Sequence, residues 1–227
     1  MARTVVHLMR HGEVFNPAGV LYGRMPGYRL SARGQAMAQQ VADVLLAGEH
    51  DVRAVIHSPL ERAEETAAPT AAAFDLPLQA DPRLIEAGNQ FEGVPVNRSR
   101  LVLASPRYWW LYRNPLRPSW GESYLEQARR MTAVVRDVLP QVEGGEALLV
   151  SHQLPIWVTR LFLEKRMLAH DPRKRQCALA SLTSLTFEGR RLVGLSYWEP
   201  AADLVAGASD MVPGCSGAAI NTGEELS

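Results

Sequence analysis

Three short segments of the sequence place arginine or histidine after an apolar run, where these side chains could handle a phosphoryl group. Arg10 and His11 follow the apolar residues of Val5–Met9 in "VVHLMRHGEV", Arg62 lies in "HSPLERAEET", and His152 lies in "LLVSHQLPI". A surface turn after a core strand would also explain each segment taken alone. In an open parallel sheet, however, ligands bind outside the carboxyl ends of the strands. The three segments are therefore expected to meet in one crevice.

Two arginines and two histidines in one crevice suit the transfer of a phosphoryl group. Arg10 and Arg62 can each bind phosphate oxygens through two N–H groups and stay charged at any working pH. A neutral His11 can attack phosphorus through one ring nitrogen, provided that a backbone carbonyl, with Gly12 as the candidate, holds the proton on the other. A protonated His152 would stabilise negative charge in the transition state. With this much fixed positive charge, the chemistry requires no metal ion and no cofactor.

Five sequence blocks resemble the histidine phosphatase superfamily in its phosphoglycerate-mutase-like branch. They come in the family's order, cover nearly all of Val5 to Trp198, and read "LMRHGE", "SPLERAEET", "RLIEAGNQFEG", "PSWGES" and "LLVSHQLPI". One such block arises often by chance, whereas five in order are a strong signal. The resemblance implies that His11 is the phosphorylated nucleophile and that Arg10, Arg62 and His152 form the phosphate pocket.

The resemblance also implies a role for Glu86, which lies in "RLIEAG". It would protonate the departing alkoxide and then activate water. This role agrees with the chemistry, because an alkoxide is a poor leaving group and needs a proton in the transition state. A carboxyl group beside a phosphate dianion should also have a raised pKa, which keeps part of it protonated near neutrality.

A further segment resembles the part of the family that supplies a side-chain amide and backbone N–H groups to the phosphate. It contains Asn16 and the "YGR" of residues 22–24. Asn16 and Gly23 are therefore predicted to bind the substrate phosphate, and Arg24 is a candidate for substrate specificity. The spacing from His11 to Asn16 is one residue shorter than in the common pattern, and so is the interval from Glu86 to the following Glu-Gly pair.

Residues 97–123 are too long for a simple connection and too aromatic for a disordered one. We expect them to form a cap over the pocket, where rings could wall an apolar part of the substrate and arginines could meet an anionic part. The candidates for substrate specificity are Arg107, Tyr108, Trp109, Trp110 and Arg113. Alternatively, the rings serve only to attach a helical insertion to the body of the protein.

The remaining histidines favour structural roles over metal binding. His7 lies four residues before His11, but on a strand-like segment with no further ligand at a matching interval, so a packed core residue is the favoured interpretation. His57 is expected to make a structural hydrogen bond at its strand end. His50 and His170 lie in polar turns. The sequence thus predicts no metal site.

The elements that must position these side chains can be read from hydrophobic periodicity. Strands are predicted near residues 3–9, 53–57 and 146–151, and a hairpin over residues 181–189 and 190–198. Helices are predicted from Ser31 to Gly48, from Pro59 onward with a kink or early end at Pro69, over residues 123–142 and over residues 155–167. This alternation predicts an α/β three-layer sandwich. Its mainly parallel central sheet would have an antiparallel edge strand and helices on both faces.

Length and composition are consistent with one α/β domain over residues 1–205, followed by a flexible tail over residues 206–227. The 24 Lys and Arg residues balance the 24 Asp and Glu residues, which argues against nucleic acid or a membrane surface as the partner. Two cysteines without ligand spacing fit a reducing compartment, and no apolar stretch approaches the length of a membrane span. A cytoplasmic protein, with a homodimer as an open alternative to a monomer, is the expectation.

Three functions remain open from the sequence. The first is a metal-independent phosphomonoester hydrolase that acts through a phosphohistidine on a small phosphorylated metabolite; inorganic phosphate or sulfate could occupy its site. The second is a phosphoglycerate-mutase-type isomerase with the same intermediate. It is disfavoured because the cap is rich in indole rings and lacks the dense basic and proline-rich pattern that we associate with glycolytic mutases. The third, a non-catalytic protein that binds a phosphorylated ligand, is disfavoured because both His11 and Glu86 are present.

Overall fold

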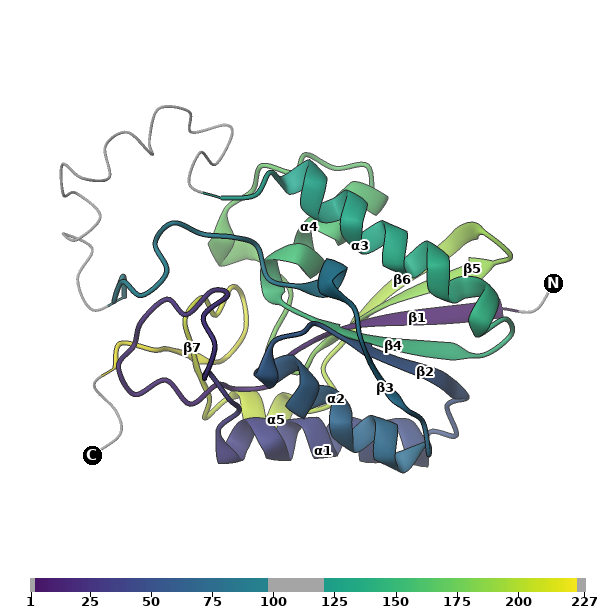
Figure 1. Cartoon of the computed structure of the whole chain (residues 1–227), viewed down its shortest axis with the longest axis horizontal. Helices are drawn as coiled ribbons and strands as arrows, with labels where there is room; N and C mark the ends of the chain where they lie inside the picture. The colour runs from purple at the N-terminus through teal and green to yellow at the C-terminus, as the bar shows by residue number, and fades with distance from the viewer. Residues whose placement is uncertain (1–2, 98–120, 224–227) are drawn as a thin grey trace.

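A six-stranded sheet forms the centre of this computed structural model, which describes residues 3–97 and 121–223 (Figure 1). The strand order is β3-β2-β4-β1-β5-β6, with β3, β2, β4 and β1 parallel and β5 antiparallel to both β1 and β6. The strands are β1 (Arg3–Arg10), β2 (Val52–His57), β3 (Leu78–Ala80), β4 (Glu146–Ser151), β5 (Leu182–Glu188) and β6 (Arg191–Trp198). This arrangement confirms the predicted fold class, and the β5–β6 hairpin forms one edge of the sheet.

Helices cover both faces of the sheet (Figure 1). One face carries α1 (Ala32–Ala47), α2 (Glu61–Ala73) and the short α5 (Ala202–Val205), and the other carries α3 (Tyr124–Val138) and α4 (Gln153–Leu163). Short 3₁₀ turns lie at Pro82–Leu84, Leu139–Gln141 and Pro172–Lys174. Because both faces are covered, β4 carries a continuous apolar run from Ala147 to Val150, and β1 is buried from Val6 to Arg10.

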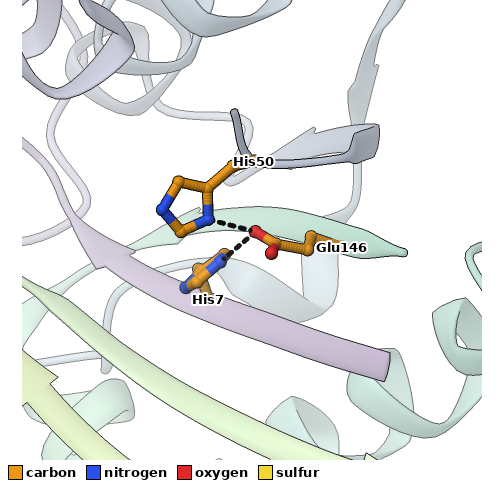
Figure 2. Close-up of side chains that lie close together, drawn as sticks. All are labelled: His7, His50 and Glu146. Carbon is orange, nitrogen blue, oxygen red and sulfur yellow. Dashed lines mark hydrogen bonds and ion pairs between the residues drawn. The ribbon is translucent and has the colours of Figure 1, made fainter. Parts of the chain in front are cut away.

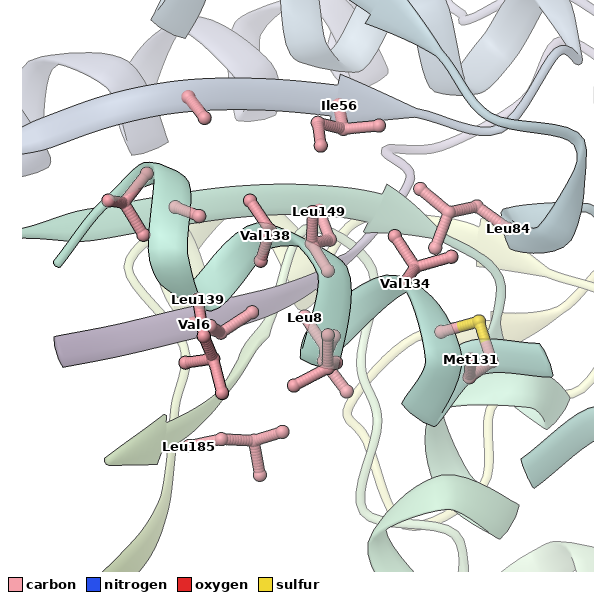
Figure 3. Packing of buried hydrophobic residues seen from close by; sticks show 14 of the residues in the cluster. Val6, Leu8, Ile56, Leu84, Met131, Val134, Val138, Leu139, Leu149 and Leu185 are labelled. Atoms are coloured by element: carbon pink, nitrogen blue, oxygen red, sulfur yellow. The ribbon is translucent and has the colours of Figure 1, made fainter. Parts of the chain in front are cut away.

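Two hydrophobic clusters, one on each face, hold the layers together. On one face Val134 and Val138 of α3 pack near Val6, Leu8 and Leu149 of the sheet (Figure 3). The cluster on the other face contains sheet residues such as Met9 and residues of α1, α2 and α5. Neighbouring residues of β1 alternate between the two clusters, as the pleat of a strand requires. The sheet is therefore fixed from both sides, and the loops at the ends of its strands start from rigid positions.

Local sequence signals set the helix ends. The Ser31 hydroxyl accepts a hydrogen bond from the Gly34 N–H at the start of α1, which ends before Gly48 as predicted. The start of α3 has a capping box between Ser123 and Glu126. By contrast, α4 begins two residues earlier than predicted, directly after His152.

The prediction that Pro69 kinks the second helix or ends it early is wrong in its second part, because α2 continues to Ala73. A proline removes one helical hydrogen bond. Here Ala63, Ala67 and Ala71 lie buried in the core on both sides of it. Burial of this face keeps the helix continuous beyond the proline.

The chain after residue 205 differs from the predicted flexible tail. Residues 206–223 are described, and they include a small parallel sheet of β7 (Ser209–Asp210) and β8 (Ala219–Ile220). Ala208 and Met211 are buried, and Asp210 forms an ion pair with Arg10 of β1. The segment is fixed because it buries apolar side chains and pairs a charge that would otherwise be isolated.

The described residues include no helix that is both long and apolar enough to cross a membrane. The predicted cap lies outside the described residues, except for its ends at residue 97 and residues 121–123. This exclusion applies to Arg107, Tyr108, Trp109, Trp110 and Arg113.

Candidate active site

A pocket of about 420 Å³ opens at the carboxyl ends of β1 and β4. The residues that line it lie far apart in the sequence, from Arg10 in β1 to Val212 after β7. They include Arg10, His11, Tyr22, Gly23, Glu86, Phe91, Tyr124, Gln153, Arg175 and Asp210. This is the edge of the sheet at which the sequence predicted the strand ends to meet.

His11 follows the last residue of β1 and is almost fully buried. Its Nδ1 lies 2.8 Å from the Gly12 carbonyl oxygen, which can only accept, so Nδ1 carries the proton and Nε2 is left with a free lone pair. Burial, followed by the positive charges of Arg62 and Arg10, holds the pKa of His11 well below its ordinary value. The ring is therefore neutral near pH 7, as a nucleophile must be.

Arg10, the last residue of β1, is held by two partners. Its Nη2 donates to Asp210 Oδ1 at 2.7 Å, and its Nη1 donates to the Cys177 carbonyl at 2.9 Å. Both Arg10 and Asp210 are 3% exposed, so this ion pair is shielded from water. The buried Nε of Arg10 has no partner among the described residues, which leaves one N–H available to a ligand.

Arg62, near the start of α2, is fixed by the loop after β1. Its Nη2 donates to the Gly23 carbonyl at 2.6 Å, and its guanidinium lies 4.8 Å from the centre of the Tyr22 ring. Gly23 has a φ of +40°, which favours glycine, and a Cβ there would collide with the carboxylate of Glu92. Like Arg10, the arginine has a buried Nε without a partner in the described part of the chain.

His152 stands directly after β4, with its ring centre 5.2 Å from that of His11. Its Nε2 lies 2.7 Å from the Ser58 hydroxyl, and the buried Nδ1 has no partner within residues 3–97 and 121–223. Burial, then the charge of Arg62, lowers the pKa of His152 well below its ordinary value. The sequence-based expectation of a protonated His152 therefore requires a bound anion to offset these effects.

Glu86 lies in the pocket wall after the Pro82–Leu84 turn. Burial raises its pKa, against the opposing effects of the Ala87 N–H, which donates to Oε1 at 2.7 Å, and of the Arg62 charge. The direction agrees with the sequence-based expectation, although the main cause is burial rather than a neighbouring anion. A carboxyl with a raised pKa can carry a proton closer to neutral pH, as a general acid must.

Four of the predicted residues that the structure describes do not line this pocket. Arg62 and His152 contact residues that do, namely Tyr22 and His11, whereas Asn16 and Arg24 have other partners. The Asn16 side-chain amide donates to the Val20 carbonyl at 2.9 Å and accepts from the Val20 N–H at 3.3 Å, so it serves its own loop and not the pocket. Arg24 donates to the Glu86 carbonyl at 2.6 Å and to Glu122 Oε2 at 3.1 Å. Its guanidinium therefore ties the Glu86 loop to Glu122, and Arg24 lines an adjacent hollow.

Sequence reasoning missed several side chains that complete the site. Asp210 balances Arg10, Ser58 contacts His152, and Tyr22 lies against Arg62. Arg175 lines the pocket as Arg10 does, which adds a third arginine to the site, and it donates to Gln153 Oε1 at 3.0 Å. The one signal for the Asp210 segment was the three-residue spacing of apolar residues 205, 208 and 211 within an otherwise small and polar stretch.

Comparison with known proteins agrees with this geometry. The model of the histidine phosphatase superfamily (branch 1) matches residues 6–199. The Mycobacterium tuberculosis protein Rv0525 is 54% identical over 199 residues, which cover 88% of this chain and 98% of that protein. A probable phosphoglycerate mutase, GpmB, of Proteus mirabilis is 35% identical over 160 residues, covering 66% of this chain and 70% of the mutase.

Solved structures share the fold. A mycobacterial glucosyl-3-phosphoglycerate phosphatase, Rv2419c, superposes with a TM-score of 0.68 at 24% identity, covering 87% of this chain and 99% of the other. That phosphatase has also been solved in complex with VO3 and with inorganic phosphate. At this identity the likeness concerns the fold alone. Because the family model matches most of the length of this chain, the chain belongs to the histidine phosphatase superfamily, branch 1.

Proposed function

We propose that this protein is a metal-independent phosphomonoesterase that acts through a phosphohistidine at His11. The observation that carries the proposal is a set of three buried nitrogens, Arg10 Nε, Arg62 Nε and His152 Nδ1, that lack partners among the described residues. They belong to three chain segments that meet around His11. Buried polar groups are normally satisfied, and a phosphoryl group offers the acceptor oxygens that such donors need.

The proposed reaction has two steps. In the first, His11 Nε2 attacks phosphorus, an N–P bond forms, and the ester P–O bond breaks with its electron pair passing to the leaving oxygen. Glu86 donates a proton to that oxygen. In the second, a water molecule attacks phosphorus while the Glu86 carboxylate takes its proton. The N–P bond then breaks and returns its electron pair to Nε2.

Fixed positive charge would stabilise both transition states. Arg10 and Arg62 would bind the equatorial oxygens, and His152 would gain a proton once the phosphate offsets the neighbouring charges. The ion pair with Asp210 keeps the Arg10 guanidinium in place. It occupies Nη2 and leaves the Nε–H of Arg10 free to bind the phosphate. Gly23 would act through its carbonyl, which positions Arg62.

The rest of the pocket indicates a small substrate with a partly apolar alcohol. Beyond the cationic residues, apolar side chains line the described walls, namely Leu21, Phe91, Val96, Leu154, Met211 and Val212. Apolar walls with a few directed polar groups are typical of small-molecule sites. We propose that the phosphate is held by the arginines and that the alcohol lies against these walls.

A phosphoglycerate-mutase-type isomerase is the second candidate. Arg175 favours it, because a further buried arginine in the pocket could hold the second acidic group that such a substrate carries. The Proteus mirabilis relative is named as a probable mutase. A mutase assay with phosphoglycerate, run beside a hydrolase assay, distinguishes the two functions by the product formed.

The test of the proposal is His11→Asn with p-nitrophenyl phosphate as substrate. We expect the variant to lose hydrolysis and to form no acid-labile phosphoprotein, while the wild type forms one and remains active in EDTA. Thermal unfolding of the variant serves as the folding control. A folded His11→Asn protein with substantial activity, or wild-type activity that EDTA abolishes while the protein stays folded, would contradict the proposal. A wild-type protein that binds phosphate but converts neither p-nitrophenyl phosphate nor phosphoglycerate would support the non-catalytic alternative.

A further inference from the structure

A second cluster of ionisable side chains lies away from the pocket, in the first half of the central strands. His7 comes from β1, Glu146 begins β4, and His50 lies in the turn between α1 and β2 (Figure 2). Glu146 Oε2 is 2.8 Å from His7 Nε2 and 2.8 Å from His50 Nδ1. His7 precedes the proposed nucleophile by four residues of extended chain, or about 13 Å. The cluster is therefore separate from the proposed phosphoryl transfer.

The three side chains offer the ligand atoms that Zn²⁺ prefers. One atom of each residue, two imidazole nitrogens and one carboxylate oxygen, lies within 4.8 Å of the other two. Tetrahedral Zn²⁺ with such ligands separates its donor atoms by about 3.3 Å, so the observed 2.8 Å contacts need to widen by only about half an ångström. The side chains converge without any change of fold.

Neighbouring groups would hold the ligands in a metal-binding arrangement. His7 Nδ1 lies 2.7 Å from the Ser184 hydroxyl, which also accepts a hydrogen bond from Trp198 Nε1 at 3.0 Å. With its proton on Nδ1, His7 presents the lone pair of Nε2 to a metal, and Ser184 is the type of partner that fixes this tautomer. The Trp198 ring stacks on His50 with an interplanar angle of 16°. Both imidazoles are thus oriented by contacts outside the cluster.

The partial exposure of the cluster makes it accessible to a metal ion and to water from the solvent. The His7 side chain is 3% exposed, whereas those of Glu146 and His50 are 18% and 28% exposed. An ion can therefore enter from the His50 side, with water as its fourth ligand. Three protein ligands and one open position are a common zinc arrangement.

From this geometry we propose that His7, His50 and Glu146 form a Zn²⁺ site that joins the turn before β2 to strands β1 and β4. The ion is structural in this position, because none of its three ligands is among the described residues that line the pocket. The proposal does not depend on the catalytic proposal.

The test is a calorimetric titration of tag-free protein with Zn²⁺, together with the visible spectrum of Co²⁺ added in its place. We expect about one ion per chain and a four-coordinate cobalt spectrum. His50→Asn and Glu146→Gln alter partly exposed ligands and should lower the affinity by more than about 100-fold, and Ser184→Ala by about 10- to 100-fold. Zn²⁺ should raise the melting temperature of the wild type and not that of His50→Asn.

Two controls locate the ion. His170→Asn removes a histidine outside the cluster and should leave Zn²⁺ binding unchanged. His11→Asn should also leave it unchanged; loss of binding in this variant would place the ion in the phosphate pocket and overturn the proposal. Wild-type protein that takes up no Zn²⁺, or equal binding by wild type, His50→Asn and Glu146→Gln, would show that the cluster is a hydrogen-bonded network only.

Discussion

The pKa of Glu86 shifts in the opposite direction from those of the two histidines around the pocket. Burial raises its pKa, whereas burial and positive neighbours lower the pKa of His11 and of His152. These opposite shifts move Glu86 towards keeping its proton and the imidazoles towards staying uncharged. Such a separation of pKa values is what the proposed roles of acid and nucleophile require.

Glu86→Gln should therefore discriminate between leaving groups. An alkyl phosphate needs a proton on its leaving oxygen, so its kcat/KM should fall by about 100- to 10,000-fold. With p-nitrophenyl phosphate, whose leaving group scarcely needs a proton, the first step should fall much less. The measurement is single-turnover kinetics with both substrates, since this separates the first chemical step from the release of phosphate.

Glu64→Gln is the matched control, because Glu64 is an exposed carboxylate on α2. It should leave both rates unchanged. Equal losses for the alkyl and aryl substrates in Glu86→Gln would identify a different acid.

At the scale of elements, the segment that contains β7 keeps Arg10 in position. Asp210 is buried, pairs with Arg10, and is itself fixed between the buried residues Ala208 and Met211. The same segment donates the Ser209 N–H to Glu13 Oε1 at 2.6 Å, so it is tied to the loop after β1 at a second point. Arg10 thus depends on a piece of chain that the sequence alone did not identify as structured.

Asp210→Asn should weaken phosphate binding by this indirect route. The guanidinium loses its charged partner and part of its orientation, and misplacement by about 1 Å can cost about 100-fold in rate. We expect kcat/KM to fall and the inhibition constant of inorganic phosphate to rise. Asp210→Ala, which leaves a buried arginine unpaired, should also lower the free energy of unfolding by about 3 to 5 kcal/mol.

Asp203→Asn, in the exposed part of α5, provides the control and should change neither quantity. An unchanged phosphate inhibition constant in Asp210→Asn, despite lost activity, would show that Asp210 acts by another route than positioning Arg10.

The sequence was most informative where function and local pattern coincide. Arg10 and His11 could be predicted to lie at a strand end because an apolar run stops there, and α1 could be bounded by Ser31 and Gly48. The role of Glu86 came from a resemblance to a family, since no local pattern marks one carboxyl as an acid.

The remaining features depend on contacts between distant residues, which no local pattern records. Asp210 lies in a stretch of small and polar residues, whose composition resembles that of a disordered tail. Neither His50 nor Glu146 stands at a metal-ligand spacing from His7, and the pairing of β4 with both β1 and β2 brings the three together. In the same way, the Asn16 amide was predicted to face phosphate, but the turn of its own loop engages it first.

For the whole molecule, the buried imidazoles predict how stability depends on pH. In the folded protein His11 and His152 have a lowered pKa, whereas in the unfolded chain they titrate near their ordinary value of 6.5. Below that value the unfolded chain binds more protons than the folded one, so the free energy of unfolding falls as the pH falls. Between about pH 7.5 and about pH 5.5 the two groups together should cost roughly 1 to 3 kcal/mol.

Urea unfolding at these two pH values measures the effect. The double variant His11→Asn and His152→Asn lacks both titrating groups, so its stability should change much less over this range. An equal decrease in the wild type and the double variant would assign the pH dependence to other groups.

Arg10 and Asp210 are separated by 200 residues, although they form one ion pair. On the ribosome, the carboxylate that holds Arg10 is added about 10 to 40 s after Arg10 and His11 at ordinary rates of synthesis. A nascent chain therefore carries the proposed nucleophile long before Arg10 has the partner that positions it. If His11 acts as proposed, chains released from stalled ribosomes before residue 210 should be inert.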